Sequence, residues 1–291
     1  MAGWLDAGWR TARDVRGRTV VVTGAASGIG EALARRFAKA GANVALLDVD
    51  EDRVRDVAAG LASRGAACMA LRCDVTGEDD CRRAIAAVID RFGAVDVLVN
   101  NAGITQRSLF ADTDVSVHRR VMDVNYFGAV HCTKAALPSL VERRGLLVVT
   151  SSIAGLAPLY ERTAYAASKH ALHGLFESLR AELADRGVGV LMVCPGFTDT
   201  AIARAALGGD GRPAAHAQST VGRLASPADV AEAVHRAVRR NRRLLVLTGV
   251  GRASALLVRL APALYERLMA RSIRRELAAA AAAPARPADG R

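Results

Sequence analysis

The sequence has few aromatic residues, no paired cysteines and no long uncharged apolar segment. Aromatic side chains make up 4% of the 291 residues, and the basic region near the C-terminus interleaves arginine with leucine and alanine instead of stacking aromatics. A nucleic-acid partner is therefore not expected. The five cysteines are odd in number and form neither a CxxC pair nor a nearby histidine ligand pattern, so we expect reduced cytoplasmic thiols and no metal site.

Neither a signal peptide nor a membrane-spanning helix is expected. The first residues include Asp6 and Asp14 and contain no apolar core of a signal peptide. The apolar stretch from Leu244 to Pro262 is interrupted by Arg252 and Arg259. These absences predict a cytoplasmic protein.

The formal net charge of +11 is concentrated at one end of the chain. From Arg236 to Arg291 there are thirteen arginines against Glu266, Glu276 and Asp289, so the first 235 residues are nearly neutral. The positive charge is therefore a local feature of the C-terminal region and not of the whole body, and a local charge of this kind favours contact with an anionic surface.

Short apolar, β-branched runs alternate with longer helical patterns, which predicts an α/β fold with a doubly wound (Rossmann) parallel seven-stranded sheet and helices on both faces. The expected strands are Val20–Val22, Val44–Leu47, Met69–Arg72, Val95–Val99, Leu146–Thr150, Val188–Val193 and Leu244–Leu247. Ligands of such sheets bind beyond the strand C-termini. The predicted organisation is an N-terminal extension (1–16), a dehydrogenase-type domain (17–249), a basic amphipathic helical extension (250–277) and a disordered tail (278–291).

A glycine-rich segment follows the first predicted strand and opens a helix. Gly24, Gly28 and Gly30 have the spacing Gly-x3-Gly-x-Gly, with Thr23 in front. Glycines allow a pyrophosphate to approach backbone N–H groups at a helix N-terminus, and a simple strand-to-helix turn is the alternative. Asp48 ends the second strand, where a carboxylate accepts bonds from ribose hydroxyls and repels a 2′-phosphate. This favours NAD, with NADP as the second choice, although Asp48 also suits a turn.

Tyr165 and Lys169 stand at i and i+4 of a helical pattern, so their side chains project from one face. A neighbouring ammonium favours the phenolate, which makes Tyr165 a candidate proton acceptor. Ser152 precedes Tyr165 by thirteen residues and Asn125 precedes it by forty. Taken alone, each has a structural explanation: Ser152 could end a strand and Asn125 could cap local backbone. Tyr165 and Lys169 could stand one turn apart by chance.

Further motifs occur in order along the chain: Asp74, the segment Asn100-Asn101-Ala102-Gly103 and the pair Pro195-Gly196. Together with the motifs above, they resemble the short-chain dehydrogenase/reductase family over roughly 17–247. The resemblance implies catalytic roles for Ser152, which holds the substrate oxygen, for Asn125, which orders a water, and for Tyr165 and Lys169. It implies that Asp74 contacts the adenine amino group, that Val75 lies beside the ring, and that Lys169 binds the nicotinamide ribose. The implied cofactor contacts are Gly24, Ser27, Gly28, Ile29, Gly30, Asp48, Asp74, Val75, Asn101, Tyr165, Lys169 and Thr198.

The segments Asn125-Tyr126-Phe127-Gly128 and Ser168-Lys169-His170-Ala171 resemble the hydroxysteroid-dehydrogenase-like branch of that family, whose members act on steroids, retinoids and other lipids. The resemblance also implies a homodimer or homotetramer. We expect a small, lipophilic alcohol or ketone substrate in a pocket lined by Leu156, Leu159, Tyr160 and Phe197. His118, His131, His170 and His173 are not expected to take part, because the Tyr-Lys pair already supplies the proton chemistry.

Segment 197–225 is small-residue-rich, which is consistent with a lid over the nicotinamide end or with an ordinary surface loop. The leucines of the C-terminal extension recur near helical spacing among arginines, and both tryptophans, Trp4 and Trp9, lie in the N-terminal extension. The chain ends could therefore contact a membrane surface peripherally, or the leucines could pack on the body or on a second subunit. A catalytically silent NAD-binding sensor or scaffold remains the alternative function.

Overall fold

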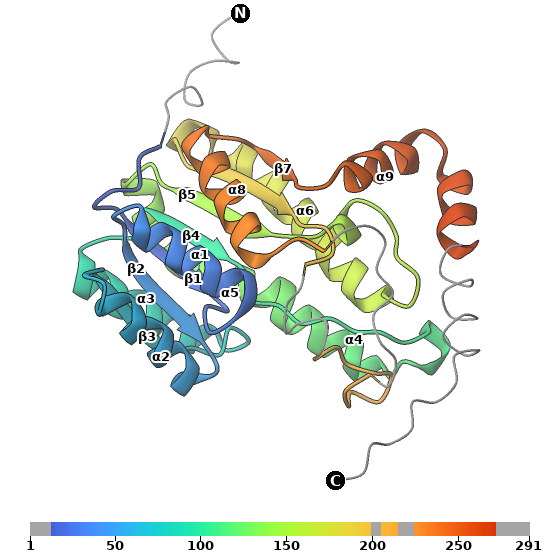
Figure 1. The fold of residues 1–291 in the computed structure, drawn as a ribbon, viewed down its shortest axis with the longest axis horizontal. Helices are drawn as coiled ribbons and strands as arrows, with labels where there is room; N and C mark the ends of the chain where they lie inside the picture. The colour runs from blue at the N-terminus through green and yellow to red at the C-terminus, as the bar shows by residue number, and fades with distance from the viewer. Residues whose placement is uncertain (1–12, 199–204, 215–223, 272–291) are drawn as a thin grey trace, which may run out of the picture.

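The computed structural model describes residues 13–198, 205–214 and 224–271. Seven parallel strands form one sheet in the order β3-β2-β1-β4-β5-β6-β7 (Figure 1). The strands are β1 (Thr19–Thr23), β2 (Asn43–Asp48), β3 (Cys68–Arg72), β4 (Val97–Asn100), β5 (Leu146–Thr150), β6 (Gly189–Cys194) and β7 (Leu244–Val246). Each overlaps one predicted strand, and the doubly wound sheet is confirmed.

Helices follow the strands along the chain. The α-helices are α1 (Gly28–Lys39), α2 (Glu51–Ala62), α3 (Glu78–Phe92), α4 (Val115–Met122), α5 (Gly128–Glu142), α6 (Thr163–Glu182), α8 (Pro227–Arg239) and α9 (Gly249–Leu260). Short 3-10 helices are η1 (Phe110–Asp112), η3 (Ile153–Gly155) and η4 (Ala184–Arg186), and η2 (Asp123–Phe127) is a π-helix.

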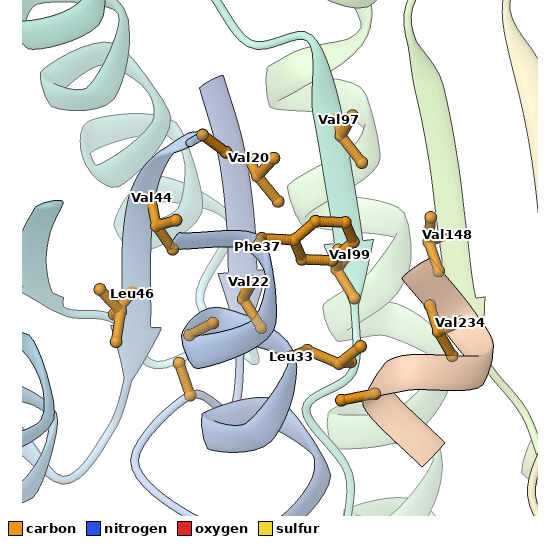
Figure 2. Close-up of a cluster of buried hydrophobic side chains, with 14 of the residues drawn as sticks. Val20, Val22, Leu33, Phe37, Val44, Leu46, Val97, Val99, Val148 and Val234 are labelled. Atoms are coloured by element: carbon orange, nitrogen blue, oxygen red, sulfur yellow. The ribbon is translucent and has the colours of Figure 1, made fainter. Parts of the chain in front are cut away.

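The sheet is buried on both faces because alternate side chains of each strand point to opposite sides. Val20 and Val22 of β1 pack with α1, α2 and α8, whereas Val21 packs with α3, α5 and α6. Figure 2 shows the first core, in which Leu33 and Phe37 of α1 lie over the strands beside side chains of α8. Burial on both faces explains why the strands read as continuous apolar runs in the sequence.

The strand order reverses between β1 and β4, whose C-terminal ends lie next to each other. After β1 the chain continues toward β2 on one side of the sheet, and after β4 it continues toward β5 on the other side, so the loops that follow the two strands diverge. A crevice at such a switch point is where doubly wound sheets bind ligands. The glycine-rich segment follows β1 and Asn101 follows β4, so both belong to this crevice.

The ends of the described chain differ from the predicted boundaries. Residues 13–16 pack on the body, since the Arg13 side chain donates to Asn241 Oδ1 at 3.1 Å and Val15 is buried in the first core. The predicted extension thus joins the body before Gly17. Trp4, Trp9 and the predicted disordered tail 278–291 lie outside the described residues.

The described part of the basic C-terminal extension is helical, and Pro262 begins its second helix. Helix α9 ends at Leu260, and residues 262–271 form a second helix. Figure 1 shows both helices standing apart from the layered body, beyond β7. In the part of the chain that the structure covers, no helix combines the length and apolarity needed to cross a membrane.

Candidate active site

The glycine-rich segment is pressed against the end of β4. Thr23 Oγ1 accepts hydrogen bonds from the N–H groups of Asn101 and Ala102, at 3.0 Å each, and Asn101 Nδ2 donates to Thr23 O at 3.0 Å. Gly24 has a φ of 65°, and a Cβ there would lie 2.8 Å from Ala102 Cα. Only glycine fits this approach. Beyond it, Ser27, Gly28 and Ile29 at the start of α1 line the cavity described below.

Two acidic residues follow the neighbouring strands β2 and β3. Asp48 Oδ2 accepts from the Ala26 N–H at 2.9 Å, and Asp48 Oδ1 accepts from the Asp50 N–H at 3.0 Å. Asp74 Oδ1 accepts from the N–H and the hydroxyl of Thr76, at 3.0 and 2.7 Å. Both carboxylates therefore serve local structure, and both also line the cavity described below. Asp48 keeps lone pairs for further donors because each of its oxygens accepts one of these bonds.

Tyr165 and Lys169 lie one turn apart on α6, as the i, i+4 spacing predicts. Lys169 Nζ donates to Thr150 O at 2.8 Å and stands 5.6 Å from the centroid of the Tyr165 ring. Burial lowers the pKa of Lys169 to about 8. The pKa of Tyr165 is raised by burial, while hydrogen bonding with Ser152 and the charge of Arg162 lower it.

Ser152 follows β5 and caps η3, where its hydroxyl accepts from the Ala154 N–H at 3.1 Å. Its extended backbone, with φ −164° and ψ 167°, turns the chain away from the sheet edge. The hydrogen bond with Ser152 lowers the pKa of Tyr165, so the two hydroxyls lie close together. The end of β5 and the start of α6 thus bring a serine, a tyrosine and a lysine to one place.

Asn125 lies in the π-helix η2, and its side chain makes three hydrogen bonds within the protein. Its Oδ1 accepts from the Ile104 N–H at 2.8 Å, and its Nδ2 donates to Ile104 O at 3.0 Å and to Ser168 Oγ at 2.9 Å. The residue is 1% exposed. The side chain ties η2 to the loop after β4. That Asn125 orders a water stays a prediction.

One cavity of about 1260 Å³ connects these groups. Among the residues predicted from the sequence, it is lined by Gly24, Ser27, Gly28, Ile29, Asp48, Asp74, Val75, Asn101, Ser152, Tyr165, Lys169 and Thr198. Two predicted site residues do not line it. Asn125 lies behind the wall, and Gly30 lies beneath the glycine loop, against Gly24.

The far end of the cavity is apolar and is walled by the C-terminal extension. Leu159 and Phe197 line it as predicted, whereas Leu156 and Tyr160 do not. Residues from α9 and from the helix at 262–271 complete the wall: Val250, Ser254, Leu257, Tyr265, Leu268 and Met269. The Tyr265 hydroxyl donates to Pro158 O at 3.0 Å and thereby fastens the extension to the loop after β5.

The predicted lid segment is described only in part. Residues 205–214 pack beside the loop after β4: Leu207 pairs with Gln106 and belongs to a buried cluster with Val117, Val121 and Ala164. This piece is part of the packed structure near α4 and does not line the cavity. The remainder of the segment, at 199–204 and 215–223, lies outside the described residues.

The sequence interpretation missed three arginines that line the cavity, Arg119 and Arg120 of α4 and Arg162 before α6. Arg162 is the one whose sequence position was informative, since it precedes Tyr165 by three residues, at the N-cap of α6. His118, His131, His170 and His173 do not line the cavity. They bond locally or pack, as with His131 Nδ1 beside Val75 O at 3.0 Å.

Known proteins match the chain over most of its length. A family model described as short chain dehydrogenase matches residues 18–209. Dehydrogenase/reductase SDR family member 7B of Danio rerio is 39% identical over 271 residues, which are 90% of this chain and 88% of that protein. An 11-beta-hydroxysteroid dehydrogenase A of Sesamum indicum is 40% identical over 189 residues, or 64% of this chain and 54% of that protein.

A solved structure shares the fold. The short chain dehydrogenase/reductase from Burkholderia phymatum in complex with NAD matches with a TM-score of 0.77 and 28% identity, covering 87% of this chain and 96% of that one. The family model spans more than half of the chain, and the relatives carry the match into the C-terminal region. This chain therefore belongs to the short-chain dehydrogenase/reductase family, is similar to its hydroxysteroid-dehydrogenase-like branch, and is an NAD(P)-dependent oxidoreductase.

Proposed function

We propose that the protein interconverts a hydroxyl and a carbonyl on a small lipophilic molecule with NAD, using Tyr165 as acid and base. The observation that carries this proposal is the meeting of Ser152, Tyr165 and Lys169 in one cavity with the glycine-rich segment. General acid–base catalysis needs a titratable group close to the reacting oxygen, and a buried phenol beside a serine hydroxyl meets that requirement.

The residues present fit a nicotinamide dinucleotide. Gly24, Ser27, Gly28 and Ile29 line the cavity at the N-terminus of α1, where the helix end would attract a pyrophosphate. Asp48 would accept bonds from the adenosine ribose, and Val49, which is 60% exposed, offers no charge to a 2′-phosphate. When bound, the nicotinamide supplies or takes up the hydride.

In the proposed step, Ser152 holds the substrate oxygen and Tyr165 exchanges the proton with it. Lys169 fixes the geometry through Thr150 and binds the nicotinamide ribose. Asn125 orders a water that continues the proton path, and its side chain holds η2 and the segment at Ile104 in place beside Lys169. A Cβ at Gly103, between them, would lie 3.1 Å from Asn125 Oδ1 and 3.6 Å from Lys169 Nζ.

The apolar far end of the cavity favours a lipophilic substrate, since Leu159, Phe197, Leu257 and Leu268 offer few polar partners. We further propose that the extension forming this end contacts an anionic membrane surface, where such a substrate would reside. Leu256 and Leu260 on α9 are 59% and 75% exposed. Arg252 and Arg259 on the same helix are exposed as well. This combination is typical of a segment that lies in a membrane interface.

We also propose a homodimer or homotetramer in solution. Exposed apolar side chains at Phe110, Val115 and Phe127 offer surface for subunit contacts. Light scattering coupled to gel filtration measures the state directly, and a monomer at working concentration would contradict this part of the proposal.

The test of the catalytic proposal combines a substrate panel with one substitution. Lipophilic alcohols and ketones are assayed with both cofactors by the absorbance of reduced nicotinamide. Tyr165→Phe should abolish turnover while NAD still binds, with Tyr160→Phe as the matched control. Retention of more than about one hundredth of the wild-type rate would contradict the assignment, because general acid–base catalysis contributes ~10²–10⁴-fold. NAD binding without turnover of any substrate would favour a silent sensor or scaffold.

A further inference from the structure

Arg162 is a buried cation one turn before Tyr165. It lines the cavity, and 9% of the residue is exposed. The preceding residue, Glu161, has a φ of 58°, a left-handed conformation that side chains disfavour. Such strain persists only where the surrounding structure holds it, and it concentrates at functional sites. The backbone thus takes a costly conformation immediately before Arg162 enters the cavity wall.

The hydrogen bonds of Arg162 go to neutral acceptors. Its Nη1 donates to Thr105 Oγ1 at 2.9 Å and to Gln106 O at 3.1 Å. No ion pair joins it to a carboxylate within the described parts of the chain. Burial and the neighbouring charge of Arg107 lower the pKa of Arg162 to about 10, with a smaller opposing effect of Glu161. A buried guanidinium without a paired anion is unfavourable, so a negative group in the cavity would stabilise it.

Tyr165 stands three residues further along the chain, lines the same cavity, and is the group that can provide that negative charge. The charge of Arg162 lowers the pKa of Tyr165, and the phenolate in turn raises that of Arg162. Lys169 directs its ammonium to Thr150 O and lies beside the ring. Cys194 also faces Tyr165, but burial raises its pKa to about 12, so the thiol is neutral at physiological pH.

We propose that Arg162 is a positioning residue whose charge, anchored on Thr105 and Gln106, stabilises the ionised form of Tyr165 before substrate arrives. This inference rests on the proposed role of Tyr165 as acid and base. In the direction of alcohol oxidation the phenolate takes the hydroxyl proton of the substrate, and the proton ends on the Tyr165 oxygen. Arg162 touches neither substrate nor cofactor in this step.

The experiment is an ultraviolet titration of the phenolate in the full-length protein without substrate. Each spectrum is taken as the difference from the same protein carrying Tyr165→Phe, so that the signal belongs to Tyr165. Arg162→Gln removes the charge and keeps an amide donor, whereas Arg162→Lys keeps the charge. Arg64→Met, at an exposed arginine that follows the C-terminal end of α2 and does not line the cavity, is the control.

We expect Arg162→Gln to move the phenolate midpoint to higher pH and to lower alcohol oxidation at neutral pH about tenfold or more, because an opposite charge nearby shifts a pKa by about one unit or more. Arg162→Lys and Arg64→Met should stay close to the wild type. An unchanged midpoint in Arg162→Gln overturns the proposal, and so does an equal shift in both Arg162 variants, which would assign the effect to hydrogen bonding.

A different result would indicate that Arg162 binds the substrate. If Arg162→Gln leaves the midpoint unchanged but raises KM for acidic substrates, the arginine binds a substrate anion and the proposal fails. If Arg162→Gln does not fold, judged by NAD binding, then Arg162→Lys decides, because a raised midpoint despite the retained charge contradicts the proposal. The titration needs no turnover, so it gives its answer even if Tyr165 proves dispensable for catalysis.

Discussion

A Cβ added at Gly30 would lie 1.9 Å from the carbonyl oxygen of Gly24 and 2.6 Å from Asn101 Nδ2. These two atoms belong to the loop after β1 and to the end of β4, so the first turn of α1 packs directly on the switch point of the sheet. Gly30 itself does not line the cavity. Its role is to let α1 approach closely enough that the loop above it keeps its shape.

Gly30→Ala should therefore destabilise the protein and weaken NAD binding together. Overpacking of this kind costs about 1–3 kcal/mol, and the displaced Gly24 carbonyl would disturb the dinucleotide cradle. Gly174→Ala on α6 is the matched control, since a Cβ there meets nothing within 4 Å and should stabilise the helix by about 0.5–1 kcal/mol. Urea unfolding and NAD titration measure both effects. Equal behaviour of the two variants would show that the close approach is unimportant.

The strands could be predicted because most of them are apolar runs buried on both faces, and most site residues because they lie at strand ends. The C-terminal wall could not be predicted in the same way. The bond from Tyr265 to Pro158 spans 107 residues, and helical spacing of leucines does not reveal what the helix packs against. Likewise, no local pattern distinguishes the π-helix at Asn125 from an ordinary turn of α-helix. The hydrogen bonds of the Asn125 side chain to Ile104 and Ser168 therefore could not be predicted from the sequence.

We predict that Asp48 sets a preference for NAD over NADP. Asp48→Ala combined with Val49→Arg should shift the ratio of kcat/KM toward NADP, because it removes a negative charge and adds a positive one where a 2′-phosphate would lie. Asp48 also bonds the Ala26 and Asp50 N–H groups, so some loss of stability is expected as well. Asp50→Ala, which removes a helix cap outside the cavity, is the control for that loss. Comparable efficiency of the wild type with both cofactors would overturn the preference.

The buried ammonium of Lys169 predicts a pH-dependent stability. Its pKa is lowered from 10.5 to about 8, so between these values the unfolded chain binds more protons than the folded one. Stability of the wild type relative to Lys169→Met should therefore rise as pH increases from about 8 to about 10.5, by up to about 3 kcal/mol. Urea unfolding at about pH 7 and about pH 10 measures the difference, with the exposed Lys134→Met as control; a flat difference contradicts the burial of a charged Lys169.

We predict that the exposed leucines of the C-terminal extension mediate binding of the protein to anionic membranes. Leu264 and Leu268 are 49% and 51% exposed, like the leucines of α9, and Arg267 and Arg271 lie exposed beside them. Apolar burial and attraction to anionic headgroups then act together, so binding should weaken with salt. The full-length protein should float with anionic liposomes at low salt and not with neutral ones, and Leu256→Asn with Leu260→Asn should reduce flotation several-fold. Leu109→Asn with Leu224→Asn, at exposed apolar positions outside the extension, is the control. Equal loss of flotation in both double variants, or a wild type that does not float, would contradict the membrane proposal. The leucines would then be assigned to a subunit contact, which an altered oligomeric state of the α9 variant would reveal.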